Sequence, residues 1–195
     1  MAGRSPAELL GRLARAGVGI AQLRAKALPD RELLALARAA VAAAREQGVL
    51  LIVNDRPDIT RLSGADGVHL GQDDLPAAAA RELLRDAVIG ISTHDPEQLA
   101  VASREPVDYV AVGPVFPTST KENPDPVVGL ELVRRARAET GLPVVAIGGI
   151  TRPRAAQVVE AGADGLAVIG DLLEAADLDA ALAEYAARLR RPTGV

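Results

Sequence analysis

The chain has no cysteine, only three aromatic residues, and only two lysines, Lys26 and Lys121, among its 22 basic residues. Without cysteine it forms no disulfides and offers no thiolate ligands to a metal. With so few aromatic side chains, its core must be built from Ala, Val, Leu and Ile. Because arginine is otherwise strongly preferred, the two lysines stand out as candidates for a functional role.

Two classes of partner are disfavoured by charge and hydropathy. A formal net charge of −4 is unlike the basic surface that nucleic acid requires. No apolar run approaches the ~20 residues needed to span a bilayer, and the first residues, MAGRSPAELL, lack the apolar region of a signal peptide. We therefore expect a cytoplasmic protein that binds neither nucleic acid nor membrane, while the sequence leaves a homo-oligomer open. At 195 residues we expect a single domain, residues 1–195.

Short β-branched runs alternate with Ala/Leu/Arg/Glu segments that have helical spacing, and this order is typical of βαβ units with a parallel sheet. The predicted strands are residues 18–23, 49–53, 67–70, 87–91, 107–112, 143–147 and 165–169. The predicted helices include 6–16, 30–47, 75–85, 96–103, 130–140, 153–161 and 178–189. The tetrapeptide GADG occurs twice, at 64–67 and 162–165, each time between a helix and a strand, where glycine suits a helix C-cap.

Polar residues follow six of the seven predicted strands. In a (β/α)8 TIM barrel the chemistry lies on this C-terminal rim, whereas an open doubly wound sheet concentrates it at one switch point. The pattern favours an α/β fold of the TIM-barrel type. Only seven strands can be counted, however, so the first strand of an eight-stranded barrel is missing from the chain as given.

Glycines and carboxylates after the strands are candidates for phosphate and metal binding. Gly148 and Gly170 follow the last two predicted strands, where barrel loops commonly bind phosphate through backbone N–H groups, although turn glycines are the alternative. Asp55 and Asp74 each come just after a strand. Two carboxylates suit Mg²⁺, which also takes water and substrate phosphate as ligands; alternatively they are helix caps, with Asp73 or Asp74 capping a helix that starts near Leu75.

The lysines lie in two different polar segments. Gln22, Arg24 and Lys26 alternate at a strand end, so an extended backbone places them on one face, either towards an anion or in a solvated loop. Lys121 follows Thr118, Ser119 and Thr120. That polar setting suits a charged lysine that binds phosphate better than a Schiff-base lysine in an apolar pocket. No serine–histidine–acid spacing indicates a hydrolase.

Seven motifs, in chain order, resemble the thiamine phosphate synthase family. They are QLRAK (22–26), ND (54–55), HLGQDD (69–74), GISTH (90–94), GPVFPTSTK (113–121), AIGGI (146–150) and GADGLAVIG (162–170). The family is a group of transferases that couple 4-amino-2-methyl-5-hydroxymethylpyrimidine diphosphate to thiazole phosphate, releasing pyrophosphate and giving thiamine phosphate. The resemblance implies a (β/α)8 barrel, small phosphorylated substrates and Mg²⁺ as cofactor.

The resemblance also implies roles for individual residues. The pyrimidine diphosphate would be bound by Gln22, Leu23, Arg24, Ala25, Lys26, Asn54, Ser92 and Lys121, and the thiazole phosphate by Thr118, Ser119, Thr120, Gly148, Ile169 and Gly170. Asp55 and Asp74 would hold Mg²⁺. Among these, the residues expected to act in catalysis are Arg24, Lys26, Ser92 and Lys121, which would stabilise charge and position the substrates.

This chain departs from the family pattern in two places. The family usually has serine where Gly170 stands, so one hydroxyl donor is lost, and it begins with a strand before the first helix. Three alternatives remain: a thiazole tautomerase-like barrel, a Schiff-base aldolase, and a phosphate-binding homologue without catalytic activity. The tautomerase-type proteins generally lack the complete QLRxK and TxTK motifs that are present here.

Overall fold

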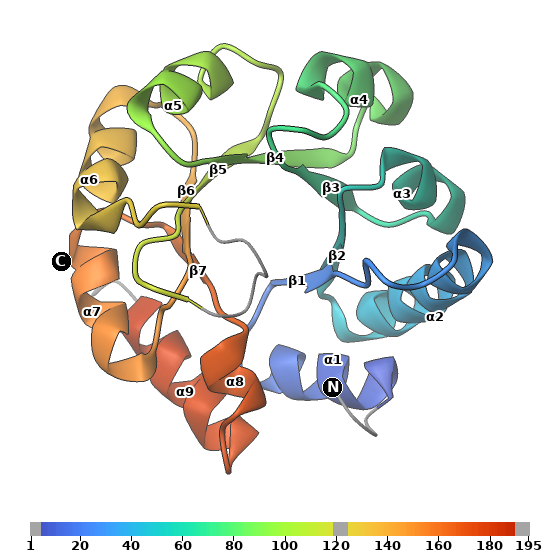
Figure 1. The fold of residues 1–195 in the computed structure, drawn as a ribbon. Coiled ribbons are helices and arrows are strands. Elements are labelled where there is room, and N and C mark those ends of the chain that lie inside the picture. Colours follow the sequence, from blue (N-terminus) through green and yellow to red (C-terminus); the bar gives the residue numbers. More distant parts are fainter. Residues whose placement is uncertain (1–4, 119–124, 190–195) are drawn as a thin grey trace, which may run out of the picture. The chain divides into compact units, whose positions relative to one another are not determined.

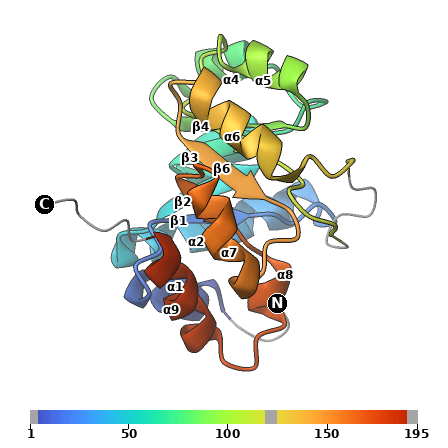
Figure 2. The ribbon, with the colours of Figure 1, turned by 90° about the vertical axis from the view of Figure 1, so that its left-hand side faces the viewer.

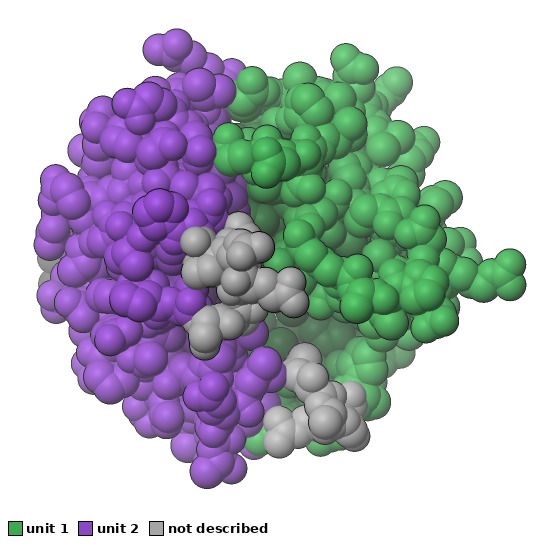
Figure 3. Space-filling view, viewed as in Figure 1, with its two compact units in different colours: residues 1–91, 105–108 green, residues 92–104, 109–195 purple. Residues whose placement is uncertain are grey.

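The computed structural model describes residues 5–118 and 125–189, which divide into two compact units. Within the described residues, unit 1 comprises residues 5–91 and 105–108, and unit 2 comprises residues 92–104, 109–118 and 125–189 (Figure 3). Strand β4 (Val88–Thr93) contributes its first four residues to unit 1 and its last two to unit 2.

Helices and strands alternate through both units, as the sequence predicts (Figure 1). Besides β4, unit 1 contains α1 (Pro6–Arg15), β1 (Ile20–Leu23), α2 (Asp30–Gln47), β2 (Leu50–Asn54), α3 (Pro57–Ser63), β3 (Gly67–Leu70) and α4 (Ala77–Leu84). Unit 2 contains α5 (Pro96–Ala102), β5 (Tyr109–Val112), α6 (Gly129–Glu139), β6 (Val144–Ile147), α7 (Arg152–Glu160), β7 (Gly165–Ala167), α8 (Gly170–Leu173) and α9 (Leu178–Leu189).

The strands form a parallel sheet whose order follows the chain from β1 to β7. In unit 1, Ile20 pairs with Leu50, and Ile52 with Gly67. In unit 2, Val110 pairs with Val144, and Val145 with Gly165. An α/β fold with seven parallel strands is therefore confirmed within the described part of the chain.

The core of unit 1 is aliphatic, as the scarcity of aromatic residues requires. Ala40, Val41 and Ala44 of α2 pack with Leu10 of α1 and with Leu51 of β2. Small alanine side chains let a helix approach the sheet closely, so this core is filled by close contact between helix and sheet and needs no large side chains. In unit 2, α6 and α7 lie side by side against the outside of the strands (Figures 1 and 2).

Local capping explains several helix ends. The Ser5 hydroxyl accepts a hydrogen bond from the Glu8 N–H, and the Asp95 carboxylate accepts one from the Gln98 N–H, which caps α1 and α5. Gly64 ends α3 in the left-handed conformation with φ 73°, as the GADG motif predicts. Among residues 5–118 and 125–189, no helix is long and apolar enough to cross a membrane.

Three aspartates, which we call the aspartate clasps, join neighbouring strands at their starts. Asp66, Asp108 and Asp164 each accept a hydrogen bond from a backbone N–H of the preceding strand, at Leu51, Ile89 and Val144, over 2.8, 2.7 and 3.0 Å. The backbone N–H of each aspartate donates back to the carbonyl of the same residue. Each clasp thereby satisfies both backbone groups of one strand residue and fixes the register of the pair.

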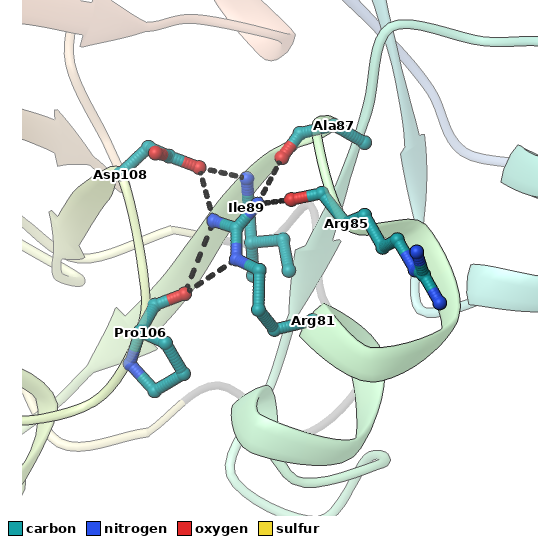
Figure 4. Close-up of polar contacts among 6 residues, drawn as sticks. All are labelled: Arg81, Arg85, Ala87, Ile89, Pro106 and Asp108. Atoms are coloured by element: carbon teal, nitrogen blue, oxygen red, sulfur yellow. Dashed lines mark hydrogen bonds and ion pairs between the residues drawn. The ribbon is translucent and has the colours of Figure 1, made fainter.

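An arginine strengthens the Asp108 clasp in unit 1 (Figure 4). Arg81 of α4 donates to the Asp108 carboxylate over 2.7 Å and to the carbonyl oxygens of Arg85, Ala87 and Pro106. One guanidinium thus links the C-terminal end of α4 to the segment that precedes β5, because it donates hydrogen bonds to backbone carbonyl groups of both. Arg137 of α6 lies 3.4 Å from Asp164 in the corresponding place in unit 2.

Candidate active site

In unit 1, two basic residues after β1 meet a carboxylate after β2. Lys26 Nζ lies 2.7 Å from Asp55 Oδ2, and Arg24 NH1 lies 4.0 Å from the same oxygen. Asp55 adopts a left-handed backbone conformation with φ 64°, which is uncommon for a residue other than glycine. Its N–H donates to the His69 carbonyl over 2.8 Å, and this bond holds the turn in place.

Asp74, which follows β3, belongs to the same cluster. Its Oδ2 accepts a hydrogen bond from the Gly71 N–H over 2.6 Å. Partial burial raises the pKa of the Asp74 carboxyl, and the neighbouring Asp55 side chain raises it further. The alternative role as a helix cap is wrong for Asp74, because α4 begins only at Ala77 and Pro76 precedes it without a side-chain cap.

The pair of carboxylates fits a magnesium ion. Mg²⁺ is usually held by one or two carboxylates together with water and substrate phosphate, so it needs no larger protein cage. Accordingly, no cluster of three or more His, Cys, Asp or Glu side chains suited to a metal occurs in the described ranges. Lys26 neutralises Asp55, and its positive charge would also attract an anion bound by the metal.

A pocket of about 200 Å³ lies beside this cluster in unit 1. Lys26, Asn54 and Asp55 supply its polar lining, and Leu23, Ala25 and Leu33 supply apolar lining. Arg56 also borders the pocket, but its guanidinium donates to Asp30 and Asp58, each over 2.6 Å. Arg56 is thus held in two ion pairs, whereas among the described residues Lys26 makes its close ion pair with Asp55 alone and its side chain is 60% exposed, so Lys26 is the cation better placed for a ligand.

Gln22 and the two basic residues after it are exposed, whereas Leu23 and Ala25 between them are partly buried. The predicted alternation is therefore confirmed. It places the polar side chains opposite the face that packs on α2. Ser92, near the end of β4, is partly buried in unit 2.

In unit 2, the predicted phosphate-loop glycines are required by the protein's own packing. Gly148 and Gly149 have φ values of 95° and 62°. A Cβ on Gly148 would lie 2.5 Å from Pro114 Cα, and one on Gly149 would lie 2.4 Å from the Pro117 carbonyl oxygen. Close approach by the loop after β5 explains both glycines, so their presence alone is not evidence of a bound phosphate.

The loops after β5 and β6 are joined by several contacts. The Phe116 N–H donates to the Gly148 carbonyl over 3.0 Å. The Arg154 guanidinium lies 4.7 Å from the centre of the Phe116 ring and donates to the Gly149 carbonyl over 3.0 Å. Thr118 follows on the same loop and is partly buried. The predicted site residues Ser119, Thr120 and Lys121 lie outside the described residues.

Ile169 and Gly170, the other residues predicted to bind the thiazole phosphate, lie at the start of a short helix. Strand β7 ends at Ala167, two residues earlier than the sequence predicts, and Gly170 begins α8. Ile169 is 39% exposed. Asp171, directly after Gly170, accepts hydrogen bonds from Tyr185 and Arg152, two residues that lie in none of the seven motifs.

His94, at the end of β4, is another residue whose contacts the sequence did not reveal. Its Nδ1 lies 2.5 Å from the Gly113 carbonyl oxygen and its Nε2 lies 3.5 Å from Asp125 Oδ2. It therefore contacts both the loop start at Gly113 and the chain at Asp125, as the hydrogen-bonded rim residue that its position suggests.

Comparison with known proteins identifies the family. The sequence profile for thiamine monophosphate synthase matches residues 1–172. The chain belongs to the thiamine monophosphate synthase family. A thiamine-phosphate synthase of Koribacter versatilis is 48% identical over 162 residues, which cover 83% of this chain and 76% of that protein. One of Syntrophomonas wolfei is 43% identical over 178 residues, covering 91% and 85%.

A solved structure supports the same family. Thiamine phosphate pyrophosphorylase from Pyrococcus furiosus has a TM-score of 0.85 and 34% identity, and the match covers 94% of this chain and 88% of that one. 3-Hexulose-6-phosphate synthase, with a TM-score of 0.71 and 21% identity, shares the fold alone. The predicted thiamine monophosphate synthase family and the predicted transferase class are confirmed.

Proposed function

We propose that this chain couples 4-amino-2-methyl-5-hydroxymethylpyrimidine diphosphate to thiazole phosphate, giving thiamine phosphate and pyrophosphate. The observation that carries the proposal is the cluster of Lys26, Asp55 and Asp74 beside a pocket in unit 1. It combines a cation for diphosphate with two carboxylates for a metal, and it sits on the motifs QLRAK, ND and HLGQDD of the family.

The diphosphate side of the reaction belongs to these residues. Arg24 and Lys26 would neutralise the phosphate oxygens together with Lys121, while Gln22 and Asn54 would donate hydrogen bonds. Leu23 and Ala25 would offer their backbone, and Ser92 would contact the pyrimidine. Asp55 and Asp74 would hold Mg²⁺, which when bound supplies positive charge that stabilises the departing diphosphate.

The proposed substitution is dissociative. The bond between the exocyclic CH₂ and the diphosphate oxygen breaks, and the electron pair leaves with pyrophosphate. The aminopyrimidine stabilises the cation that remains, and the thiazole nitrogen donates its lone pair to form the new C–N bond. No protein nucleophile takes part, so these side chains act by positioning the reactants and stabilising charge.

On the second substrate, the phosphate would be bound by the loops after β5, β6 and β7. Their predicted residues are Thr118, Ser119, Thr120, Gly148, Ile169 and Gly170. Because Gly170 has no side chain, its N–H is the donor that it offers. We also propose that the seven strands belong to a (β/α)8 barrel in one cytoplasmic domain; the TM-score of 0.85 to the Pyrococcus structure supports the barrel.

The test is incubation with both substrates and Mg²⁺, with thiamine phosphate and pyrophosphate measured by chromatography. We expect both products in equal amounts, and none when either substrate is omitted. Lys121→Ala is expected to lower kcat/KM by at least about 100-fold, as loss of a charge-stabilising group does. A variant with near-wild-type kcat/KM would refute the role of Lys121, and binding without turnover by the wild-type chain would favour the non-catalytic alternative.

A further inference from the structure

Three side chains that the proposed mechanism does not use meet beside the loops after β6 and β7. Asp171 Oδ2 accepts a hydrogen bond from the Tyr185 hydroxyl over 2.9 Å and one from Arg152 Nε over 3.0 Å. We call Arg152, Asp171 and Tyr185 the Asp171 network. Its members come from α7, α8 and α9, all within unit 2.

Tyr185 is the most enclosed member, with 6% of its surface exposed. Its hydroxyl also lies 3.3 Å from the Ile150 carbonyl oxygen, at the end of the loop after β6. Burial raises the pKa of the Tyr185 hydroxyl, and the adjacent Asp171 raises it further, so the group stays a proton donor. One buried hydroxyl thereby contacts Ile150, two residues after Gly148, and Asp171, the residue after Gly170.

Arg152 completes the network from the other side. It is the first residue of α7, two positions after Ile150, and its NH1 also lies 3.6 Å from Glu184. Its guanidinium balances the charge of Asp171, whose carboxyl group follows directly after Gly170. An unpaired carboxylate at that position would repel a phosphate bound at Gly170.

We propose that the Asp171 network positions Gly170, and the end of the loop after β6 at Ile150, for the phosphate of the thiazole substrate and balances the charge of Asp171, which would otherwise oppose its binding. This inference rests on the proposed function. Glycine offers only a backbone N–H, and a backbone donor stabilises an anion well only when its position is fixed beforehand. The network would hold the backbone N–H of Gly170 in place with side chains from three helices, since residue 170 has no side chain of its own.

Tyr185→Phe is the first test, because it removes the hydroxyl and keeps the buried ring. The KM for thiazole phosphate is expected to rise about 5- to 20-fold, less than the full effect of losing a hydrogen bond to a charged group, because the hydroxyl acts through the loops and does not touch the substrate. The KM for the pyrimidine diphosphate is expected to change less than about twofold, since its proposed ligands lie mostly in unit 1. Calorimetric titration with thiazole phosphate alone should show the same loss of affinity.

A rescue experiment separates positioning with charge balance from ordinary packing. Arg152→Gln leaves Asp171 without its cation and should raise the KM for thiazole phosphate more than Tyr185→Phe does. Adding Asp171→Asn to Arg152→Gln removes the uncompensated charge and should recover part of that loss. Glu174→Gln, which removes a nearby negative charge outside the network, is the matched control and should leave both KM values unchanged.

The outcomes distinguish this inference from the proposed function. A wild-type chain that binds neither substrate and makes no product overturns the proposed function. If the wild-type chain turns over but Tyr185→Phe lowers only the melting temperature, the network is structural and the inference is wrong. A double variant that is no better than Arg152→Gln alone overturns the charge-balance part.

Discussion

Asp74 is a residue whose surroundings favour function over stability. Partial burial and the nearby Asp55 carboxyl both disfavour its ionised form, and they raise its pKa. Such like-charge arrangements are costly in the ligand-free protein and are typical of functional sites. A bound cation together with the substrate would offset this cost. Replacing the Asp74 carboxylate should therefore weaken metal binding while it stabilises the ligand-free protein.

Asp74→Asn tests that opposition. The amide oxygen can still accept the hydrogen bond from the Gly71 N–H, while the like charge beside Asp55 is removed. The ligand-free variant should melt at the same temperature as the wild type or higher, and Mg²⁺-dependent turnover should fall at least about 10-fold. Differential scanning calorimetry and initial rates measure both quantities.

Asp73→Asn is the control for this substitution, because Asp73 is the exposed neighbour and carries the same charge. It should change neither the melting temperature nor the rate. A lower melting temperature for Asp74→Asn with an undiminished rate would show that Asp74 has a structural role and does not hold the metal.

At the residue scale, motifs and alternation predicted the polar cluster of unit 1, because all of its members lie within a few residues of a strand end. The reasons for Gly148 and Gly149 could not be predicted in this way. The atoms that exclude a side chain there belong to Pro114 and Pro117, which are distant in sequence. The Asp171 network was missed for the same reason, although Tyr185 is one of only three aromatic residues.

At the scale of elements, the aspartate clasps explain a repeat that the sequence shows only in part. The two GADG tetrapeptides contain Asp66 and Asp164, and both aspartates bind the preceding strand. Asp108 does the same without flanking glycines, so the tetrapeptide does not reveal it. The repeated feature is therefore the carboxylate that precedes a strand, while the glycines serve the turns around it.

Arg81→Met tests how much one clasp depends on its arginine. Methionine keeps most of the apolar stem but removes the donors to Asp108 and to three carbonyl oxygens. The variant should lose about 2 kcal/mol of unfolding free energy, since hydrogen bonds to charged groups contribute about 1.5–3 kcal/mol. For a chain of this size, that is a fall in melting temperature of about 4–8 °C.

Arg104→Met is the matched control, because Arg104 is exposed and its side chain makes no hydrogen bond or ion pair in the described part of the chain. It should melt within about 1 °C of the wild type. Turnover at low temperature should be unaffected in both variants. If Arg81→Met and Arg104→Met melt together, the Asp108 clasp does not need its arginine.

The elements that escaped prediction are those with too little sequence to show a period. Helix α8 has four residues, about one turn, so hydrophobic spacing could not reveal it. Helix α4 starts two residues later than predicted because Pro76 lies at its N-cap and the Asp74 carboxylate binds Gly71 instead. The strands were predicted well because parallel strands covered on both faces are continuous apolar runs.

At the scale of the whole molecule, most residues proposed to bind the pyrimidine diphosphate belong to unit 1, whereas the described residues proposed to bind the thiazole phosphate belong to unit 2. Arg24, Lys26 and Asp74 belong to unit 1, whereas Gly148 and Gly170 belong to unit 2. Strand β4 contributes residues to both units, so we expect the two units to unfold together.

Binding of the pyrimidine diphosphate with Mg²⁺ should therefore stabilise the whole chain rather than one part. At a ligand concentration of about 100 times Kd, the unfolding free energy should rise by about 2.7 kcal/mol. For a protein of this size, the melting temperature should then rise by about 5–10 °C, measured by scanning calorimetry as one transition that moves intact. Chelating the metal, or replacing Asp74 with Asn, should abolish most of the shift. Two transitions, of which only one responds to the ligand, would mean that the units unfold separately and that the single-domain prediction is wrong.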